Sequence, residues 1–364
     1  KDIAVDAKGV VYLAAIGGFF RISGDKVEEL GDYQMPGSLD HIAIGADGTV
    51  WGVSYDGVTR YQGGKFIRDE KEKALPGAKL LEDIVVDAAG AVWVAASDFL
   101  YKHDAGSWQK VDTAAIDDKP FFGTLAAGAD GTIYAKTMSG VARLRKGAWD
   151  VIKPGDFVNV TTMAPTPAGA LVVGAYSEMY IVGTDGAKNK INPKKAFGAG
   201  TVKDVAVDGS GRIWVSTDNG TVILDGDGKV LQHWVPGSIR EVAGDIEAVA
   251  FVGGGPALPT LSGEIGKGTV TGKLLRAGKG VAGATVELCP SPGMMFEKTP
   301  CGDAVFKRSA TTGADGAFSF ADVPISHYGL AMKAGEKWQI MMSLDCCEAM
   351  QPGDSFEIPS IALD

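Results

Sequence analysis

One phrase recurs six times between Asp2 and Val215, and it constrains the fold more than any other feature of the chain. Each copy has a short apolar run, a turn that ends in glycine, and a second apolar run that usually carries an aromatic residue. The turn glycines are Gly9, Gly48, Gly90, Gly131, Gly169 and Gly211, at steps of 39, 42, 41, 38 and 42 residues. A repeat of this length indicates an array in which each unit buries its apolar face against the next.

Each repeat contains four apolar segments of strand length, separated by turns that are rich in glycine. No long stretch with a helical period of 3.6 residues interrupts them. Four strands in about 40 residues are typical of one blade of a β-propeller. Residues 247–261 look like a seventh first strand with a partial second. The sequence therefore predicts an all-β chain that begins with a seven-bladed propeller, with six blades as the alternative.

Two copies of the repeat resemble a known family. Residues 51–61 (WGVSYDGVTRY) and 214–224 (WVSTDNGTVIL) are similar to the two-component-regulator propeller repeat, and the resemblance extends over about residues 1–235. Related propellers include binding modules, sensor ectodomains and streptogramin lyases. The resemblance therefore implies the fold and leaves the function open.

The period ends near residue 262, and a different domain is expected beyond it. Residues 268–270 (GTV), 283–286 (GATV) and 312–320 (TGADGAFSF), with Tyr328, resemble the carboxypeptidase-regulatory-like or collagen-adhesin B-type β-sandwich, which has an Ig-like or transthyretin-like fold. The predicted domains are a propeller at 1–262 and this sandwich at 263–364. The resemblance implies a spacer, a stabiliser or a binding domain without catalysis.

The four cysteines all lie in the predicted sandwich. They are Cys289, Cys301, Cys346 and Cys347. An even, clustered set favours disulfides and an oxidising compartment. Because adjacent residues of a strand point to opposite faces, we expect Cys289 and Cys301 each to pair with one of Cys346 and Cys347. A local Cys289–Cys301 bridge is the alternative.

Charge and hydropathy exclude two classes of protein. The net charge is −10, from 35 Lys and Arg against 45 Asp and Glu, and no basic block is present to neutralise nucleic-acid phosphates. The longest apolar stretch, at 9–20, is shorter than the ~18 residues that a membrane-spanning helix needs. We therefore expect neither a nucleic-acid partner nor a transmembrane segment.

The inner ends of the first strands are the strongest candidate site. The position expected to begin each first strand is here called the slot, and in the six copies it reads Asp2, His41, Asp83, Thr124, Thr162 and Asp204. Asp40 and Glu82 stand directly before the slots of the second and third copies, and Glu247 begins the seventh copy. First strands line the channel of a propeller, so we expect Asp2, Asp40, His41, Glu82, Asp83, Asp204 and Glu247 to cluster at one mouth. Oxygen ligands suit hard cations, so a calcium ion at Asp2, Asp83 and Asp204 is a hypothesis, beside the alternative that these groups only meet channel water.

The same face carries the loops between the second and third strands. Large apolar residues stand in or beside several of them: Tyr55, Phe99, Met138 and Tyr176. Exposed aromatic residues with polar neighbours often mark binding surfaces. The alternative is that each packs against a neighbouring blade.

These observations favour a recognition protein without catalytic activity or cofactor, located in the bacterial cell envelope as a periplasmic, outer-membrane-anchored or secreted protein. One propeller face would bind a ligand, a protein or a glycan, and the sandwich would act as a spacer or second interaction module. Two alternatives stand beside this hypothesis. One is a lyase or hydrolase that uses His41 with a divalent cation, and the other is a structural assembly subunit of the envelope.

Overall fold

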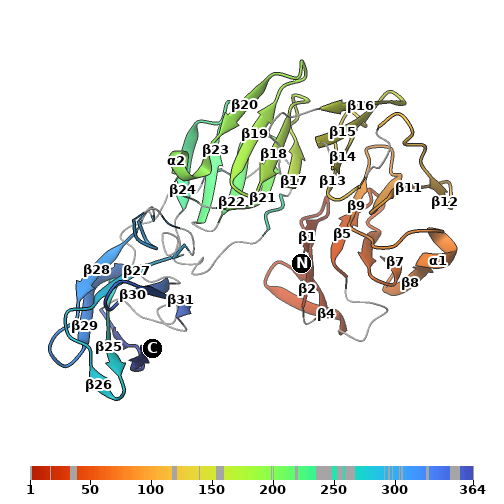
Figure 1. Ribbon diagram of the computed structural model, residues 1–364. Coiled ribbons are helices and arrows are strands. Elements are labelled where there is room, and N and C mark those ends of the chain that lie inside the picture. The colour runs from red at the N-terminus through yellow and green to blue at the C-terminus, as the bar shows by residue number, and fades with distance from the viewer. Residues whose placement is uncertain are drawn as a thin grey trace.

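The structure is a computed structural model of the whole chain (Figure 1). It describes residues 2–16, 18–32, 39–116, 121–138, 140–152, 160–197, 199, 201–217, 220–234, 248–251, 257–258, 267–290, 292–293, 296, 298–302, 304, 306–324, 328–344 and 353–363. Nearly all of the regular structure is β-strand, as predicted.

Six four-stranded antiparallel sheets follow one another along the chain, each in the order in which its strands occur in the sequence. The first three are formed by β1 (Asp2–Val5), β2 (Val11–Ala15), β3 (Gly18–Ser23) and β4 (Lys26–Asp32); by β5 (His41–Ile44), β6 (Val50–Ser54), β7 (Gly57–Gln62) and β8 (Lys65–Glu70); and by β9 (Asp83–Val86), β10 (Val92–Ala96), β11 (Phe99–Asp104) and β12 (Ser107–Lys110). The next three are formed by β13 (Leu125–Ala127), β14 (Ile133–Thr137), β15 (Gly140–Arg145) and β16 (Ala148–Ile152); by β17 (Val160–Pro165), β18 (Leu171–Ala175), β19 (Glu178–Val182) and β20 (Lys188–Ile191); and by β21 (Val202–Val207), β22 (Ile213–Thr217), β23 (Gly220–Leu224) and β24 (Val230–Trp234). These sheets are the blades of the predicted propeller.

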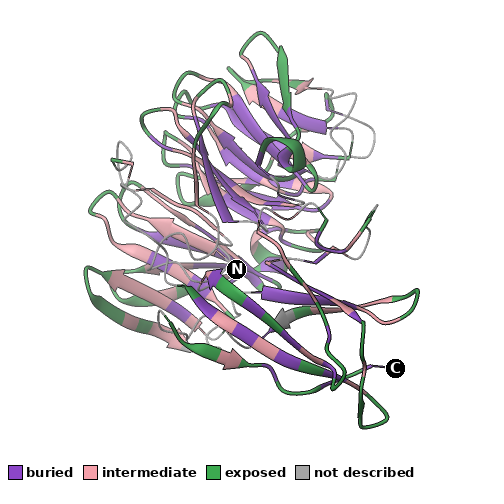
Figure 2. Ribbon diagram, turned by 90° about the vertical axis from the view of Figure 1, so that its left-hand side faces the viewer, coloured by how far each residue is buried: buried purple, intermediate pink, exposed green. Residues whose placement is uncertain are grey.

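The blades pack side by side through apolar faces, and their second strands are the most buried. Trp51, Trp93 and Trp214 lie in equivalent second strands and are at most 8% exposed. Figure 2 shows buried residues along the middle of the blades and exposed residues at their turns and outer strands. Neighbouring first strands contact one another from β1 to β5 and onward to β21, so the first strands form the inner wall.

An aspartate organises the turn between the first two strands of most blades. Asp87 Oδ1 accepts hydrogen bonds from the N–H groups of Ala89 and Ala91, and Asp6 and Asp208 repeat this pattern. In the second blade Gly45 stands at this position, and the carboxylate of Asp47 binds Thr49 instead. A Cβ on Gly45 would lie 2.8 Å from Asp47 Oδ1, so glycine leaves room for the exchanged aspartate.

A short segment after the sixth blade continues the pattern of first strands. The N–H of Val249 donates to Asp204 Oδ2, and the ring of Phe251 lies 5.0 Å from that of Trp214. In this register Ala248, not Glu247, occupies the seventh slot. Residues 235–247, 252–256 and 259–266 lie outside the described part of the chain, so the seventh blade and the domain boundary near 262 remain predictions.

The C-terminal part contains two sheets that share one core. One sheet has the order β26–β25–β29 with β32 and β33 beside β25, and the other has the order β28–β27–β30–β31. The strands are β25 (Lys267–Arg276), β26 (Lys279–Gly280), β27 (Thr285–Cys289), β28 (Arg308–Thr311), β29 (Ala317–Pro324), β30 (Tyr328–Lys333), β31 (Trp338–Leu344), β32 (Ser355–Glu357) and β33 (Ile361–Ala362). Phe318 and Phe320 are both buried in this core, as expected from their alternation. The sandwich family that the sequence resembles is not established by these strands alone.

Within the described residues, helix is limited to two single turns in the loops that join the blades. These are α1 (Lys71–Ala74) and α2 (Pro193–Phe197). Neither of these helices is long enough or apolar enough to cross a membrane, and the described residues contain no other candidate span.

The disulfide differs from the expected pairing. Cys289 bonds to Cys301, with their Cα atoms 5.8 Å apart, so the prediction that each pairs with Cys346 or Cys347 is wrong. Both partners are fully buried, Cys289 at the end of β27 and Cys301 in the loop that follows. A separation of 12 residues lets this loop fold back to the strand end without the last hairpin. Cys346 and Cys347 lie outside the described residues.

We expect the double variant Cys289→Ser/Cys301→Ser to lower the free energy of unfolding of the C-terminal sandwich by about 3 kcal/mol, the loop-closure entropy of a ring of this size. Urea unfolding of the variant and wild type measures this difference. Mass spectrometry of unreduced peptides should find Cys289 linked to Cys301. A peptide that links either of them to Cys346 or Cys347 would contradict the structure.

Candidate binding face

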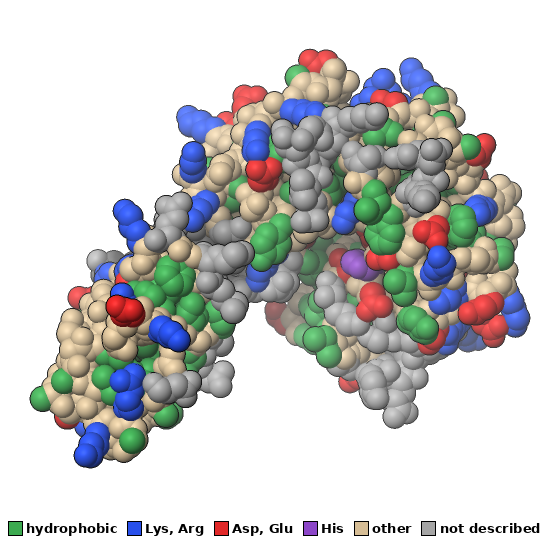
Figure 3. All heavy atoms as spheres, viewed as in Figure 1, with side chains coloured by type: hydrophobic (Ala, Val, Ile, Leu, Met, Phe, Trp, Pro, Cys, Tyr) green, Lys and Arg blue, Asp and Glu red, His purple; other side chains and the backbone are tan. Residues whose placement is uncertain are grey.

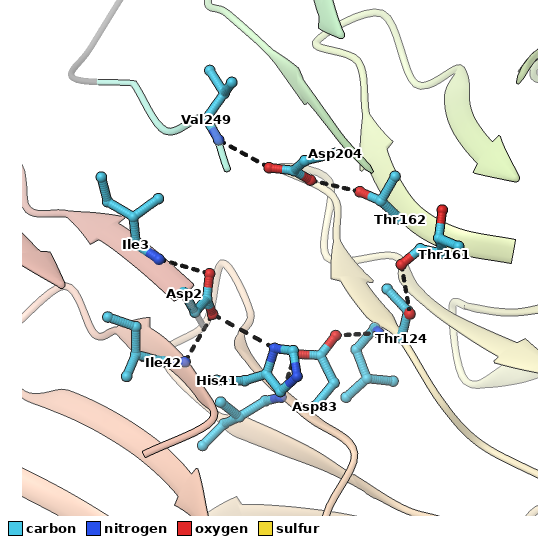
Figure 4. Close-up of polar contacts among 12 residues, drawn as sticks. Asp2, Ile3, His41, Ile42, Asp83, Thr124, Thr161, Thr162, Asp204 and Val249 are labelled. Carbon is cyan, nitrogen blue, oxygen red and sulfur yellow. Dashed lines mark hydrogen bonds and ion pairs between the residues drawn. The ribbon is translucent and has the colours of Figure 1, made fainter. Parts of the chain in front are cut away.

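The slots of the six blades lie together around the mouth of the channel. The slot residue is the first residue of β1, β5 and β9, directly precedes β13, and is the third residue of β17 and β21. All six slots therefore lie near the same end of a first strand, on one face of the propeller that is here called the first-strand face. Figure 4 shows Asp2, His41, Asp83, Thr124, Thr162 and Asp204 arranged around this mouth. Of the residues predicted for the mouth, the structure places Asp2, His41, Asp83 and Asp204 around it, and their role as a ligand site stays a prediction.

Three aspartates at the slots hold neighbouring blades together. Asp2 Oδ1 accepts from the N–H of Ile3 in its own strand, and its Oδ2 accepts from the N–H of Ile42 in the next blade, at 2.9 Å. We call such a hydrogen bond to the following first strand a staple. The staple removes the cost of leaving a backbone N–H without a partner at the inner edge.

The same arrangement occurs twice more around the mouth. Asp83 accepts from Ile84 and from Leu125 of the fourth blade, both at 2.7 Å. Asp204 accepts from Val205 and from Val249, the first-strand segment after the sixth blade. Carboxylates whose oxygens already accept backbone N–H groups therefore have a structural role here.

Threonines continue the ring where aspartate is absent. Thr162 Oγ1 accepts from the N–H of Val205 and donates to Asp204 Oδ1, at 2.7 Å. Thr124 Oγ1 donates to the carbonyl of Thr161 in the fifth blade. Every described junction from the third blade to the seventh first strand therefore has a polar side chain that bonds to the neighbouring first strand.

His41 lies between two of the aspartates. Its Nδ1 is 3.8 Å from Asp2 Oδ2 and 3.7 Å from Asp83 Oδ1, and 44% of its side chain is exposed. In the protonated form this imidazolium forms ion pairs with carboxylates of the first and third blades. His41 is the one slot residue that offers an exposed titratable nitrogen to a ligand.

Burial raises the pKa of two slot aspartates, Asp83 and Asp204. Removal from water raises the pKa of Asp83 from 3.8 to about 6, although His41 and the N–H groups of Leu125 and Ile84 oppose this shift. Removal from water likewise raises the pKa of Asp204, against the opposing hydrogen bonds from Val249 and Thr162. Desolvation of the charged form is the dominant cause in both cases.

The remaining predicted residues of the mouth take other positions. Glu82 Oε1 accepts from the hydroxyl of Ser97, and the N–H of Asp40 donates to the carbonyl of Val53. Both residues precede a slot and lie on the first-strand face. Glu247 is outside the described residues, and the register of Val249 places it before the slot.

The described residues contain no group of three or more histidine, cysteine or acidic side chains that could hold a metal ion. The calcium hypothesis placed Asp2, Asp83 and Asp204 in one such group. In the structure they belong to three different blades and direct their oxygens at backbone amides.

The hairpins between second and third strands carry exposed apolar side chains on the same face. The tips of four blades present a large apolar residue that is at least 60% exposed: Ile16 (84%), Tyr55 (70%), Met138 (77%) and Tyr176 (60%). Ile16 was not identified from the sequence, although it occupies the same hairpin position as Tyr55. Figure 3 shows hydrophobic side chains beside a histidine and acidic groups around the hollow between the blades.

The third blade differs at this position. Its tip has Ser97 and Asp98, and Phe99 is the first residue of β11, where it packs against the core between the second and third blades. The Phe99 ring therefore does not stand free at the tip. The chain that leaves the third blade contacts this tip instead, since the N–H of Phe122 donates to the carbonyl of Ser97. This contact places the preceding residue, Phe121, beside the tip.

The tip backbones of the second and fifth blades, like that of the third, are held by the chain that enters the next blade. The N–H of Lys71 donates to the carbonyl of Asp56, and the N–H of Val202 donates to the carbonyl of Tyr176. Lys71 Nζ also donates to the carbonyl of Tyr55 and lies 4.5 Å from the centre of its ring. These contacts fix the tips while their apolar side chains stay exposed.

The two faces of the propeller differ in polarity. Six exposed large apolar residues of the described propeller belong to tips or loops of the first-strand face: Ile16, Tyr55, Leu80, Phe121, Met138 and Tyr176. The other four lie on outer strands: Val27, Ile67, Val230 and Leu231. The described turns of the opposite face contribute none.

Two further histidines lie away from the mouth. His103 packs between Trp51 and Trp108, with ring centres 5.1 and 5.0 Å away, and burial lowers its pKa. His233 lies on β24 near Phe197. His327 is outside the described residues. Among the described histidines, His41 alone reaches the mouth.

The chain was compared with known proteins. No family model and no curated protein matches it. Virginiamycin B lyase from Staphylococcus aureus aligns with a TM-score of 0.55 at 15% identity, over 64% of this chain and 83% of the lyase. The extracellular domain of a putative one-component system from B. thetaiotaomicron aligns with a TM-score of 0.54 at 12% identity, over 93% of this chain and 55% of that one.

A bacterial surface protein gives a similar result. PorZ, a component of the type-IX secretion system of Porphyromonas gingivalis, aligns with a TM-score of 0.54 at 15% identity, over 94% of this chain and 58% of PorZ. This chain thus spans less than two thirds of the two longer proteins. At such identities the likeness shows the propeller fold and no more.

The raised pKa of Asp83 predicts how the stability of the protein changes with pH. A carboxyl that holds its proton more tightly in the folded state stabilises the protein at low pH, and this contribution is lost as the pH rises from about 4 to about 6. We expect Asp83→Asn to remove this dependence. The free energy of unfolding of this variant, relative to that of wild type, should increase by up to about 3 kcal/mol when the pH is raised from 4 to 7.

Chemical denaturation at a series of pH values measures this relative stability. Thr124→Val is the matched control, because it removes a junction hydrogen bond without a titratable group, and its difference from wild type should stay constant. A constant difference for Asp83→Asn as well would show that burial does not control this carboxyl.

Proposed function

We propose that this protein is a non-catalytic recognition protein that binds its partner on the first-strand face of the propeller. The observation that carries the proposal is the segregation of exposed apolar side chains. Ile16, Tyr55, Met138 and Tyr176 repeat at equivalent tips of this face, whereas the described turns of the opposite face have no such residue. A soluble surface rarely concentrates large apolar groups without a binding role.

The rigidity of the tips supports the same function. Hydrogen bonds from Lys71 and Val202 fix the backbones of the Tyr55 and Tyr176 tips in advance of binding. Preorganised contact residues lose little conformational entropy when a partner docks, so more of the contact energy appears as affinity. Tyrosine and methionine also supply large contact areas, and tyrosine is enriched among residues that dominate binding energy.

We further propose an extracytoplasmic location, with the C-terminal sandwich as a spacer or a second interaction module. The buried Cys289–Cys301 disulfide supports an oxidising compartment. The fold relatives that extend over most of this chain are an extracellular domain and a surface component. An envelope or secreted recognition protein agrees with both observations.

Catalysis of the lyase or hydrolase type is less well supported. The described residues bring a single imidazole to the mouth, and the carboxylates beside it accept backbone N–H groups of two blades. The likeness to a lyase extends to the fold alone at 15% identity. We therefore assign His41 and its neighbours to the wall of a binding face.

The proposal predicts where ligands selected from unbiased collections will bind. We expect binders from a random phage-displayed peptide library, or hits on a glycan array, to lose at least about 100-fold in affinity with the variant Ile16→Ser/Tyr55→Ser/Met138→Ser/Tyr176→Ser, because a few large residues carry most of the binding energy of an interface. Surface plasmon resonance measures the affinities.

The matched control removes four exposed apolar residues from the outer strands: Val27→Ser, Ile67→Ser, Val230→Ser and Leu231→Ser. This variant should bind as wild type does. If binders tolerate the tip variant, or if both variants lose affinity equally, the first-strand face is not the recognition surface.

A further inference from the structure

The chemistry of the first-strand face also indicates what kind of partner it binds, provided that the proposed function is correct. Its apolar positions are mixed. Ile16, Leu80 and Met138 are aliphatic or thioether side chains, and Tyr55, Phe121 and Tyr176 are aromatic. Sugars need planar rings and several polar groups, whereas apolar side chains of a polypeptide pack on both types. The mixture therefore favours a polypeptide over a glycan.

The mouth inside this apolar set carries negative charge on the side of the first three blades. Among the described residues, the ion pairs of Asp2 and Asp83 are with His41 alone, and no lysine or arginine compensates either carboxylate. His41 is the partly exposed group between them. An anionic partner would meet repulsion here, and a cation would be attracted.

The lysines on the same side are engaged elsewhere. Lys71 is buried, and its Nζ donates to the carbonyls of Tyr55 and Lys79. Lys79 pairs with Asp98 at 2.9 Å, and Lys73 pairs with Glu70 at 2.6 Å. In the later blades two lysines stand near the first-strand face, Lys136 in β14 and Lys203 directly before the slot residue Asp204, so the described face is less negative there than at blades one to three.

We infer that the partner is a polypeptide segment that places a lysine or arginine at the Asp2–His41–Asp83 side of the mouth and apolar side chains on the hairpin tips. A long basic side chain suits this arrangement, because its methylene stem packs along apolar groups while its charged end lies near Asp2, whose side chain is 27% exposed, and is attracted by the negative charge of the mouth. The negative charge of the mouth favours a basic residue in the middle of the partner segment, and the hairpin tips provide most of the contact area for its apolar residues.

The test uses the full chain and a random peptide library displayed on phage. We expect the enriched sequences to share one lysine or arginine flanked by apolar residues. The best peptide is then synthesised with its basic residue and with glutamine in its place, and both are titrated by isothermal calorimetry. The basic peptide should bind about tenfold more tightly at 50 mM salt, and this advantage should shrink at 500 mM salt as screening increases.

A variant of the protein locates the charge interaction. Asp2→Asn should weaken binding of the basic peptide about fivefold and leave the glutamine peptide within twofold. Because this change also alters a staple, thermal unfolding accompanies it, and the salt series on wild type provides the same information without any mutation.

The outcomes separate the inference from the function on which it rests. Peptides that need the hairpin tips but bind equally well with glutamine and show no salt dependence would overturn the basic residue and leave the recognition face intact. Glycan hits that need the tips, with no peptide binder, would overturn the polypeptide partner alone. Peptides that ignore the tip variant would overturn both.

Discussion

The inner edge of each first strand sets the central physical constraint of this propeller. A backbone N–H that faces the channel side of a first strand has no partner in its own blade, and leaving it unpaired is costly. The slot side chain of the preceding blade supplies the acceptor, as Asp2 does for Ile42 and Asp83 for Leu125. This joint fixes each first strand against the next at the mouth, beside the apolar packing that joins the blades farther out.

The blades and the slots could be predicted from the sequence because both recur at a nearly constant spacing, although the residues differ from copy to copy. The turn at Gly48 and the slot at His41 recur in every copy, and the structure brings the described slots to one mouth. What the period could not show was what the slot carboxylates bind. A pattern of oxygen-bearing residues suits a cation and a backbone amide equally, and only the register across blades assigns them to amides.

Other features depended on contacts between distant segments. Phe99 looked like a tip residue by its position, but the following strand begins at it and turns its ring into the core. Ile16 could have been found by aligning the hairpins, since it matches Tyr55 in place and differs from it only in type. The disulfide partner of Cys289 depended on how the loop to Cys301 folds back, which spacing alone leaves open.

One consequence concerns the place where the ring of first strands must meet itself. The register of Val249 puts Ala248 in the seventh slot, and a methyl group accepts no hydrogen bond. Ala248 therefore has no side-chain acceptor of the kind that Asp2, Asp83 and Asp204 supply at three junctions. The side chains at the inner ends of the first strands thus change from carboxylate to hydroxyl to methyl along an array whose backbone pattern repeats.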